Sequence, residues 1–424
     1  MKQTEIGLIP DDWEVKKLGD NVDIFRGGSP RPIEKYLTTN ADGINWIKIG
    51  DVRPNDKYIH QTEEKIISEG KARSREVKKG DFILSNSMSF GRPYILNIDG
   101  CIHDGWLTIQ NYAVSFDKEY LYYLLGSDEI FKQYVQMAAG SSVQNLNKEK
   151  VSDLQLKVPP LPEQQRIAKA LSDVDALIST TEKLLQKKKN IKQGTMQNLL
   201  TGKKRLPGFA KSNNTKMTEL GEIPEDWEVK SLRDIAFVTK LAGFEFTAHV
   251  NYSEIGKIIA LRGLNVKKGY LVLDDVKFID NSNFSKLDRS KLYINDLLFT
   301  YVGTVGNVAL VNKNDTYYLA PNVALIRGNK YVYSYFLMYL MLSQHFFDNQ
   351  IQALMSTTSQ AALSMTNIRL FKIPLPSIEE QTAIATVLSS MDKEIETLNT
   401  KLEKYRNLKT AMMQQLLTGK IRLI

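Results

Sequence analysis

The stretch PDDWEVK, residues 10–16, brings two aspartates, a glutamate and a lysine close together. Carboxylates near an E-x-K spacing are typical of a magnesium-dependent nuclease, which needs a further carboxylate from a separate strand to complete its metal site. In a strand, Asp12, Glu14 and Lys16 would share one face while Trp13 packs on the other. We therefore interpret the stretch as a half-buried structural strand, and a nuclease site is the rival hypothesis.

The same letters return, as IPEDWEVK, at residues 223–230. The flanking sequences also match, since EIGLIPDDWEVKKLGD begins at Glu5 and ELGEIPEDWEVKSLRD begins at Glu219. A second matched pair, LLTGKKRL from Leu199 and LLTGKIRL from Leu416, closes each half at nearly the same separation. A large-period repeat redefines the fold, so we predict two tandem copies whose middles have diverged.

Within each copy the residue pattern predicts a mixed α+β domain. Short β-branched or aromatic runs bounded by Gly, Asn and Asp predict strands at residues 78–84, 89–97, 294–300 and 304–312. Apolar-faced helices packed on that sheet are predicted at residues 118–136 and 331–350.

Two long helices without internal proline are expected to follow the domains, each about 38 residues and, at 1.5 Å per residue, about 57 Å long. Apolar residues recur in steps of three and four, which is the pattern of a coiled-coil seam. A pseudo-twofold relation between the copies would pair these seams antiparallel. The seam residues are Leu171, Val174, Ile178 and Leu185 in the first helix and Leu388, Met391, Ile395, Leu398, Leu402 and Tyr405 in the second.

Lysines crowd the first helix at Lys183, Lys187, Lys188, Lys189 and Lys192. Charges that flank a coiled-coil seam are usually a solvated face, and this is our interpretation. DNA contact and docking of a partner subunit are the alternatives.

The composition favours a multidomain protein that binds a polyanion. The chain has 424 residues, a formal charge of +8 and a pI near 9.1. One cysteine and four scattered histidines give no disulfide and no zinc spacing, so we expect no structural metal. No apolar run is long enough to span a bilayer and the N-terminus lacks a signal-peptide core, which predicts a cytoplasmic protein.

Motifs for the chemistry of DNA modification are missing. The sequence KVPPLP around Pro159 and Pro160 lacks the Asn and aromatic residue of an amino-methyltransferase loop. The ending LLTGKKR lacks the glycine spacing and hydroxyl of a phosphate-binding loop and is better interpreted as a helix C-terminus. We therefore predict a binding protein rather than an enzyme. A stand-alone repressor made from a fused pair is the alternative beside the nuclease.

The chain resembles the specificity (S) subunits of type I restriction-modification systems. The resemblance rests on the G-x-I-P-x-D-W openings at Gly7 and Gly221, the P-x-P-x-x-E-Q type helix starts near Pro160 and Pro374, and the LLTGK endings. It also covers the GGSPRP turn followed by INWIKIGDV. In the second copy VTKLAGFEF, from Val238, replaces that turn, so the resemblance is weaker there.

The resemblance implies two target-recognition domains, each reading one half of a split, asymmetric DNA site, separated by two long antiparallel helices. It implies double-stranded DNA and two modification (methyltransferase) subunits as partners, with restriction subunits joining through them and no membrane. S-adenosylmethionine, ATP and magnesium would be bound by those subunits, with no cofactor in this chain. The expected domains are residues 1–156 and 207–372, with the long helices in residues 157–206 and 373–424.

For DNA contacts we select polar residues in the expected loops, because arginine can pair with guanine, asparagine with adenine, and lysine or hydroxyls with phosphate. The candidates are Arg26, Ser29, Arg31, Lys48, Arg53, Ser87, Ser89 and Arg92 in the first domain and Lys240, Arg262, Asn265, Tyr301, Thr304 and Asn307 in the second.

Overall fold

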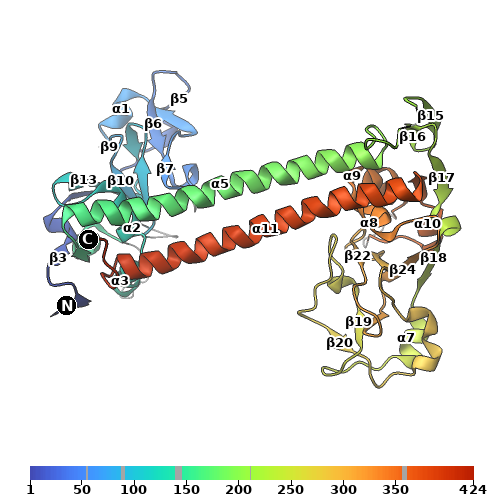
Figure 1. Ribbon diagram of the computed structural model, residues 1–424. Coiled ribbons are helices and arrows are strands. Elements are labelled where there is room, and N and C mark those ends of the chain that lie inside the picture. Colours follow the sequence, from blue (N-terminus) through green and yellow to red (C-terminus); the bar gives the residue numbers. More distant parts are fainter. Residues whose placement is uncertain (54–55, 87–90, 139–145, 211, 356–360) are drawn as a thin grey trace. The chain divides into compact units, whose positions relative to one another are not determined.

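A computed structural model of the chain describes residues 1–53, 56–86, 91–138, 146–210, 212–355 and 361–424. The chain forms two compact units (Figure 1), one made of residues 1–182 and 400–424 and the other of residues 183–399. The boundary falls inside both long helices. Each unit therefore combines one globular domain with a stretch of each long helix.

Two sheets form the globular domain of the first unit. Within the described residues their strand orders are β4-β13-β10-β11-β7 and β5-β8-β6-β12-β9. The β7–β11 and β6–β12 pairs are parallel, and the other neighbours are antiparallel. The strands are β4 (Asp23–Arg26), β5 (Leu37–Thr38), β6 (Ile44–Ile47), β7 (Tyr58–Ile59), β8 (Glu64–Ile66), β9 (Arg75–Val77), β10 (Phe82–Ser85), β11 (Pro93–Leu96), β12 (Gly100–Ile102) and β13 (Trp106–Gln110).

The second unit repeats this framework. Its described sheets have the orders β18-β24-β21-β22 and β20-β19-β23, with β19 and β23 parallel. These orders match β4-β13-β10-β11 and β8-β6-β12, so the predicted internal repeat is confirmed. The strands are β18 (Ala236–Lys240), β19 (Ile259–Leu261), β20 (Lys277–Phe278), β21 (Leu297–Thr300), β22 (Val308–Leu310), β23 (Tyr317–Leu319) and β24 (Val323–Gly328).

We predicted that the PDDWEVK stretch forms one continuous strand, and this prediction is wrong. Asp11 and Asp12 lie in a turn, and only Glu14 onward is extended. The strands around the two copies pair as β1–β2, β3–β14, β15–β16 and β17–β25. Their bounds are β1 (Lys2–Thr4), β2 (Gly7–Ile9), β3 (Glu14–Lys17), β14 (Gln155–Val158), β15 (Thr215–Thr218), β16 (Gly221–Pro224), β17 (Glu228–Ser231) and β25 (Lys372–Leu375).

The predicted helices at 118–136 and 331–350 are each interrupted. The first divides into α2 (Lys118–Leu125) and α3 (Asp128–Ala138), and the second into α8 (Ser334–Leu342), α9 (Gln344–Phe346) and a π-helix (Phe347–Gln352). A serine stands at each break: the Ser127 hydroxyl accepts from the Ile130 amide at 3.4 Å and that of Ser343 from Phe346 at 3.2 Å. Because serine caps a new first turn in this way, it ends one helix and starts another.

Five further short α-helices are described. They are α1 (Ser68–Lys71), α4 (Lys148–Ser152), α6 (Leu232–Ile235), α7 (Gly243–His249) and α10 (Met365–Leu370). None of the helices that the structure describes is long and apolar enough to cross a membrane.

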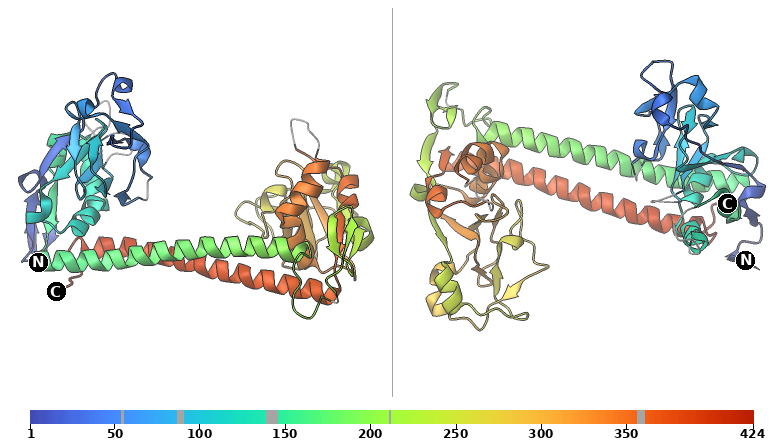
Figure 2. Two further views of the ribbon diagram at one scale, coloured as in Figure 1. Left: turned by 90° about the horizontal axis from the view of Figure 1, so that it is seen from above. Right: turned by 180° about the vertical axis from the view of Figure 1, so that it is seen from behind.

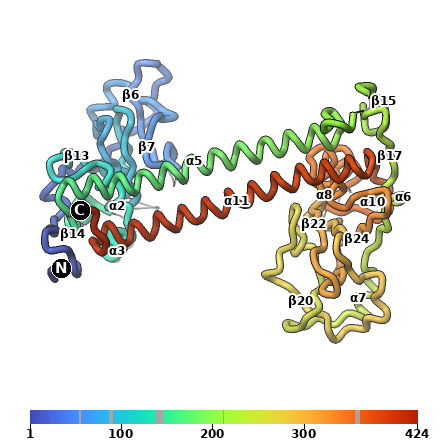
Figure 3. The backbone as a smooth tube through the Cα atoms, in the orientation of Figure 1, coloured from blue at the N-terminus to red at the C-terminus, as the bar shows by residue number. Residues whose placement is uncertain are grey.

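The two long helices are present as α5 (Leu161–Leu200) and α11 (Ile378–Leu416), with 40 and 39 residues. Figure 3 traces both along the backbone. A glycine in the left-handed region follows shortly after each helix end, Gly202 (φ 73°) and Gly419 (φ 71°), and such a glycine is a usual helix C-terminal signal. The LLTGK endings are therefore helix ends, as predicted.

Within each unit the helix stretches run antiparallel. In the first unit Asp175 of α5 pairs with Lys409 of α11 at 2.7 Å, and Glu182 pairs with Arg406 at 2.6 Å. In the second unit Lys188 pairs with Glu394 at 2.6 Å and Lys192 pairs with Asp392.

Candidate nucleic-acid interface

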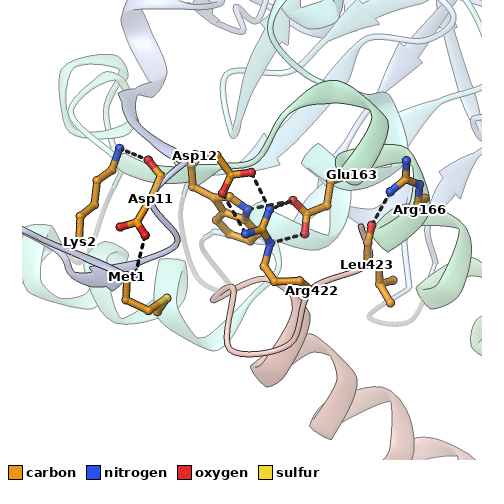
Figure 4. A network of polar contacts seen from close by, with 9 residues as sticks. Met1, Lys2, Asp11, Asp12, Glu163, Arg166, Arg422 and Leu423 are labelled. Atoms are coloured by element: carbon orange, nitrogen blue, oxygen red, sulfur yellow. Dashed lines mark hydrogen bonds and ion pairs between the residues drawn. The ribbon is translucent and has the colours of Figure 1, made fainter.

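The opening PDDWEVK stretch belongs to an ion-pair cluster that ties the two ends of the chain together (Figure 4). Trp13 is fully buried, and its indole Nε1 donates to Glu163 Oε2 at 3.0 Å. The Arg422 guanidinium donates to both carboxylate oxygens of Asp12, at 2.9 and 2.7 Å, and to both oxygens of Glu163 at 2.7 Å. Asp12 of the motif is therefore paired with an arginine.

This cluster also controls the ionisation of Glu163. Burial raises the pKa of the Glu163 carboxyl, but hydrogen bonds from Arg422 and Trp13 outweigh it and hold the pKa below its usual range. The pKa of Asp12 is lowered as well, chiefly by its hydrogen bonds with Arg422.

The second copy forms the same cluster within its own unit. Arg205 donates to Asp226 at 2.8 Å and to Glu380 at 2.5 Å, and the indole of Trp227 donates to Glu380 at 3.2 Å. Both arginines follow the LLTGK ending of a long helix. We name each set an arginine clasp: Asp12, Trp13, Glu163 and Arg422 in the first unit, and Asp226, Trp227, Glu380 and Arg205 in the second.

The glutamates of the E-x-K spacing are paired with their own lysines. Glu14 lies 3.2 Å from Lys16, and Glu228 lies 2.9 Å from Lys230. Among the described residues no group of three or more His, Cys, Asp or Glu side chains could hold a metal ion. Geometry therefore favours the structural interpretation of the motif.

Three of the residues selected in the first domain converge on Asp104. The Ser29 hydroxyl donates to the carboxylate at 2.8 Å, Arg31 lies 3.5 Å from its second oxygen, and Arg26 Nε donates to the backbone carbonyl at 3.4 Å. Burial raises the pKa of Asp104. The hydrogen bond from Ser29 and the neighbouring cations lower it by more, so the pKa lies below its usual range. Asp104 thus orders the turn that carries these side chains.

A hollow of about 760 Å³ adjoins this cluster. It is lined by Ser29, Arg31 and Asp104 and also by Lys48, which forms an ion pair with Glu64 at 2.7 Å. Three residues chosen from the sequence, Ser29, Arg31 and Lys48, therefore line one hollow, and a fourth, Arg26, contacts Asp104 at its wall.

The other candidates of the first domain are less closely grouped. Arg53 is exposed, and Arg92 is half-buried directly after the left-handed Gly91. Ser87 and Ser89 lie outside the residues that the structure describes.

The second domain has a hollow of about 460 Å³ in the matching loops. Arg262, Thr304 and Asn307 line it. The Arg262 guanidinium donates to the carboxylate of Asp275 at 2.6 Å and to its backbone carbonyl at 3.0 Å. Thr304 is exposed, and Lys240 is also exposed and lies over the Tyr301 ring at 5.4 Å.

Three candidates of this domain are buried and engaged inside the fold. Asn265 is fully buried, and its amide donates to the carbonyls of Val272 and Asp275 at 3.0 and 2.7 Å. Asn307 is 7% exposed and donates to the Val266 carbonyl at 3.0 Å, while Tyr301 is 8% exposed and packs in the core. Their polar or aromatic type suggested DNA contact, but in this structure each one supports a loop.

A basic turn beside this hollow was not among the candidates chosen from the sequence. Lys267 and Lys268 precede Gly269, whose φ of 96° allows the chain to reverse, and the Lys267 amide donates to the Tyr270 carbonyl at 3.0 Å. The Tyr270 side chain is 60% exposed. The letters KKGY between two short apolar runs are a turn signal that could have identified it.

The predicted seam residues of the long helices are buried or half-buried. Leu171, Val174, Leu185, Leu388 and Leu402 are buried, and Ile178, Met391, Ile395, Leu398 and Tyr405 are half-buried.

Residues 10–193 and 224–404 each match the family of the type I restriction modification DNA specificity domain. The chain belongs to this family and carries two copies of the domain. Its function is accordingly DNA recognition as a specificity subunit, and neither the repressor nor the nuclease alternative finds support.

Similar proteins extend over nearly the whole chain. The MjaVIII specificity subunit of Methanocaldococcus jannaschii is 27% identical and the alignment covers 98% of this chain and 94% of the relative. The EcoBI specificity subunit of Escherichia coli is 25% identical, over 97% and 87% of the two chains.

Solved structures share the fold at low identity. The S subunit of a type I restriction-modification system from M. genitalium has a TM-score of 0.55 and 13% identity, covering 95% of this chain and 96% of that one. The HsdS subunit from Thermoanaerobacter tengcongensis has a TM-score of 0.50 and 16% identity, covering 97% and 98%.

Proposed function

We propose that each half of the chain reads one part of a bipartite, asymmetric DNA site. The observation that carries this proposal is one framework built twice with different side chains at matching loop positions. The Ser85 amide bonds to the Arg92 carbonyl at 3.3 Å, and the Thr300 amide bonds to the Asn307 carbonyl at 3.0 Å, so Arg92 and Asn307 are equivalent positions. Arg92 is half-buried whereas Asn307 is buried and braces a loop, so one frame carries different loops in the two halves, which suits two unlike half-sites.

For the first half-site, Ser29, Arg31 and Lys48 line the first hollow and Arg26 contacts Asp104 beside it, while Arg53 and Arg92 lie elsewhere in the domain. For the second half-site, Lys240, Arg262 and Thr304 offer accessible polar groups, whereas Asn265, Tyr301 and Asn307 shape the loops. Hydrogen bonds to base edges give sequence specificity, while phosphate contacts fix the position of the protein on the duplex.

The long helices are proposed to dock two modification (methyltransferase) subunits, one for each repeat, and the restriction subunits would join through them. Leu184 and Ile191 support this, because they lie seven residues apart on α5 and are 40% and 44% exposed. Residues with this spacing face one side of a helix, and exposed apolar side chains there suit a partner helix. S-adenosylmethionine, ATP and magnesium would be bound in those partners, and a complex acting on genomic DNA would work in the cytoplasm.

Mapping of N6-methyladenine in the source genome tests this function. The genome of the wild type should carry methylation in a split motif, and deletion of the coding sequence for this chain should remove that motif alone. A complete set of motifs in the deletion strain would contradict the proposal.

A further inference from the structure

We propose that Lys48 and Arg262 are equivalent base-reading residues, one for each half-site, and that each contacts the acceptor edge of a guanine. The inference rests on the proposed function and adds a base and a position within each domain. It further assigns Glu64 and Asp275 as positioning residues that aim these two cations.

The backbone around the two cations is the same. Lys48 directly follows β6, Arg262 directly follows β19, and a single 3-10 turn comes next in each domain. The Lys48 amide donates to the Asp51 side chain at 2.6 Å, and the Arg262 amide donates to the Asn265 side chain at 3.0 Å. Each cation therefore starts from an equivalent and internally braced position.

The strands beside them also correspond. Ile47, the residue before Lys48, is paired in parallel with Ile102 of β12, and Leu261, the residue before Arg262, is paired in parallel with Leu319 of β23. A backbone fixed on both sides gives the same starting point for two side chains of different reach. The presence of lysine in one domain and arginine in the other therefore changes the side chain offered to DNA without changing the backbone framework.

A carboxylate holds each cation at the wall of its hollow. Lys48 Nζ lies 2.7 Å from Glu64, and Arg262 Nη2 lies 2.6 Å from Asp275. The two cationic side chains are only 28% and 21% exposed.

Arg262 retains unused hydrogen-bonding capacity. Its Nε is buried and has no hydrogen-bond partner among the described residues, although a buried donor normally has one. Arg262 also lines the second hollow, beside Thr304. Rotation of the guanidinium toward a ligand with acceptors in the hollow would relieve the cost of this unpaired donor.

Guanine offers the matching acceptors. Its N7 and O6 face the major groove, and their contact with arginine or lysine is the commonest specific pairing in protein–DNA complexes. Glu64 and Asp275 would each neutralise part of the charge of the cation they hold. The remaining donors of Lys48 and Arg262 would stay directed toward the hollow. Discrimination would therefore come from hydrogen bonds rather than from general attraction to phosphate.

The test uses the complete complex of this chain with its modification subunits and a duplex containing its motif. Each guanine of the motif is replaced in turn by 7-deazaguanine, which lacks the N7 acceptor. With the wild type, one replacement in each half-site should weaken binding by roughly tenfold. With Arg262→Ala, binding should be weaker but insensitive to the replacement in one half-site, and Lys48→Ala should have this effect in the other half-site alone.

Non-additivity is the decisive result, because it shows that the side chain and N7 interact directly. Retention of full 7-deazaguanine sensitivity at every guanine in Arg262→Ala or Lys48→Ala would overturn the assignment for that domain, as would a half-site without guanine. Arg262→Met and Lys48→Met, which keep an unbranched side chain without a hydrogen-bond donor, serve as second variants and must show the same loss of sensitivity. Failure of the wild type to bind the motif would instead overturn the proposed function.

Adjacent carboxylates provide matched controls for the positioning residues. Asp275→Asn and Glu64→Gln should reduce discrimination between guanine and adenine several-fold at the affected position, and Asp275→Glu should recover part of it. Asp274→Asn and Glu63→Gln, one residue away and exposed, should leave it unchanged. Equal discrimination in all these variants would overturn the positioning role.

Discussion

Arg422 Nε donates to Glu163 Oε1 at 2.7 Å, although 259 residues separate them in the chain. The corresponding arginine, Arg205, reaches Glu380 from only 175 residues earlier. In the first unit the clasp joins the two chain ends, whereas in the second it is made within a continuous segment. Figure 2 shows both termini close together in each of its views, at the first unit.

Removal of the E-x-K carboxylates is expected to leave function intact. Complexes assembled with the Glu14→Gln or Glu228→Gln variant should methylate the motif at nearly the wild-type rate, because each glutamate makes only a local pair with a lysine. Trp13→Ala should lower the free energy of unfolding by roughly 3 to 5 kcal/mol, since it deletes a fully buried ring. Chemical denaturation and a methylation assay check the two halves of this prediction, and inactive but well-folded glutamine variants would contradict the structural interpretation of the motif.

The clasp should make stability depend on pH. The folded pKa of Glu163 lies below its unfolded value, so the contribution of the ion pair is complete above the unfolded pKa, near 4.5, and is lost as pH falls through the folded pKa. Arg422→Met should destabilise the first unit by roughly 3 to 5 kcal/mol at neutral pH, because Glu163 stays buried without its partner. Unfolding measured from pH 6 down to pH 3 should show a smaller loss of stability in the variant than in the wild type. If the stability of the variant and of the wild type fell in parallel with pH, Glu163 would not be the cause of the pH dependence.

The arginine clasp also predicts that the chain tolerates new ends. A circular permutant that joins Ile424 to Met1 through about a dozen flexible residues, with new termini near Asn213, should fold and support methylation of the original motif. Residues 212–217 are exposed, so a break there disturbs no core. Binding to the modification subunit and mapping of methylated sites check this. An insoluble permutant, prepared beside an active wild type, would count against the circular connection.

The repeat and the long helices could be predicted because their signals are local and duplicated: matched letters at both ends of each half, and steps of three and four in the seams. The breaks at Ser127 and Ser343 were missed because the apolar pattern continues across them while a serine cap resets the helix. Asp12 was placed on a strand because its partner, Arg422, is remote in sequence.

Candidate DNA residues could be chosen by type but not by exposure. Ser29, Arg31 and Lys48 reach one hollow, whereas Asn265 and Asn307 satisfy backbone carbonyls. An asparagine in a loop serves either purpose, and only the surrounding chain decides which. The carboxylates Glu64, Asp104 and Asp275, which hold the cations, have no sequence signal of their own.

Exchange of one recognition domain tests the central claim most directly. Residues from about 20 to 150 would be replaced by those of a relative with a different motif, and N6-methyladenine would be mapped in cells that express the hybrid with the modification subunits. The account predicts that one half of the methylated motif changes to that of the relative while the other half stays as it is. A motif changed in both halves, or in neither, by an active hybrid would contradict independent reading by the two domains.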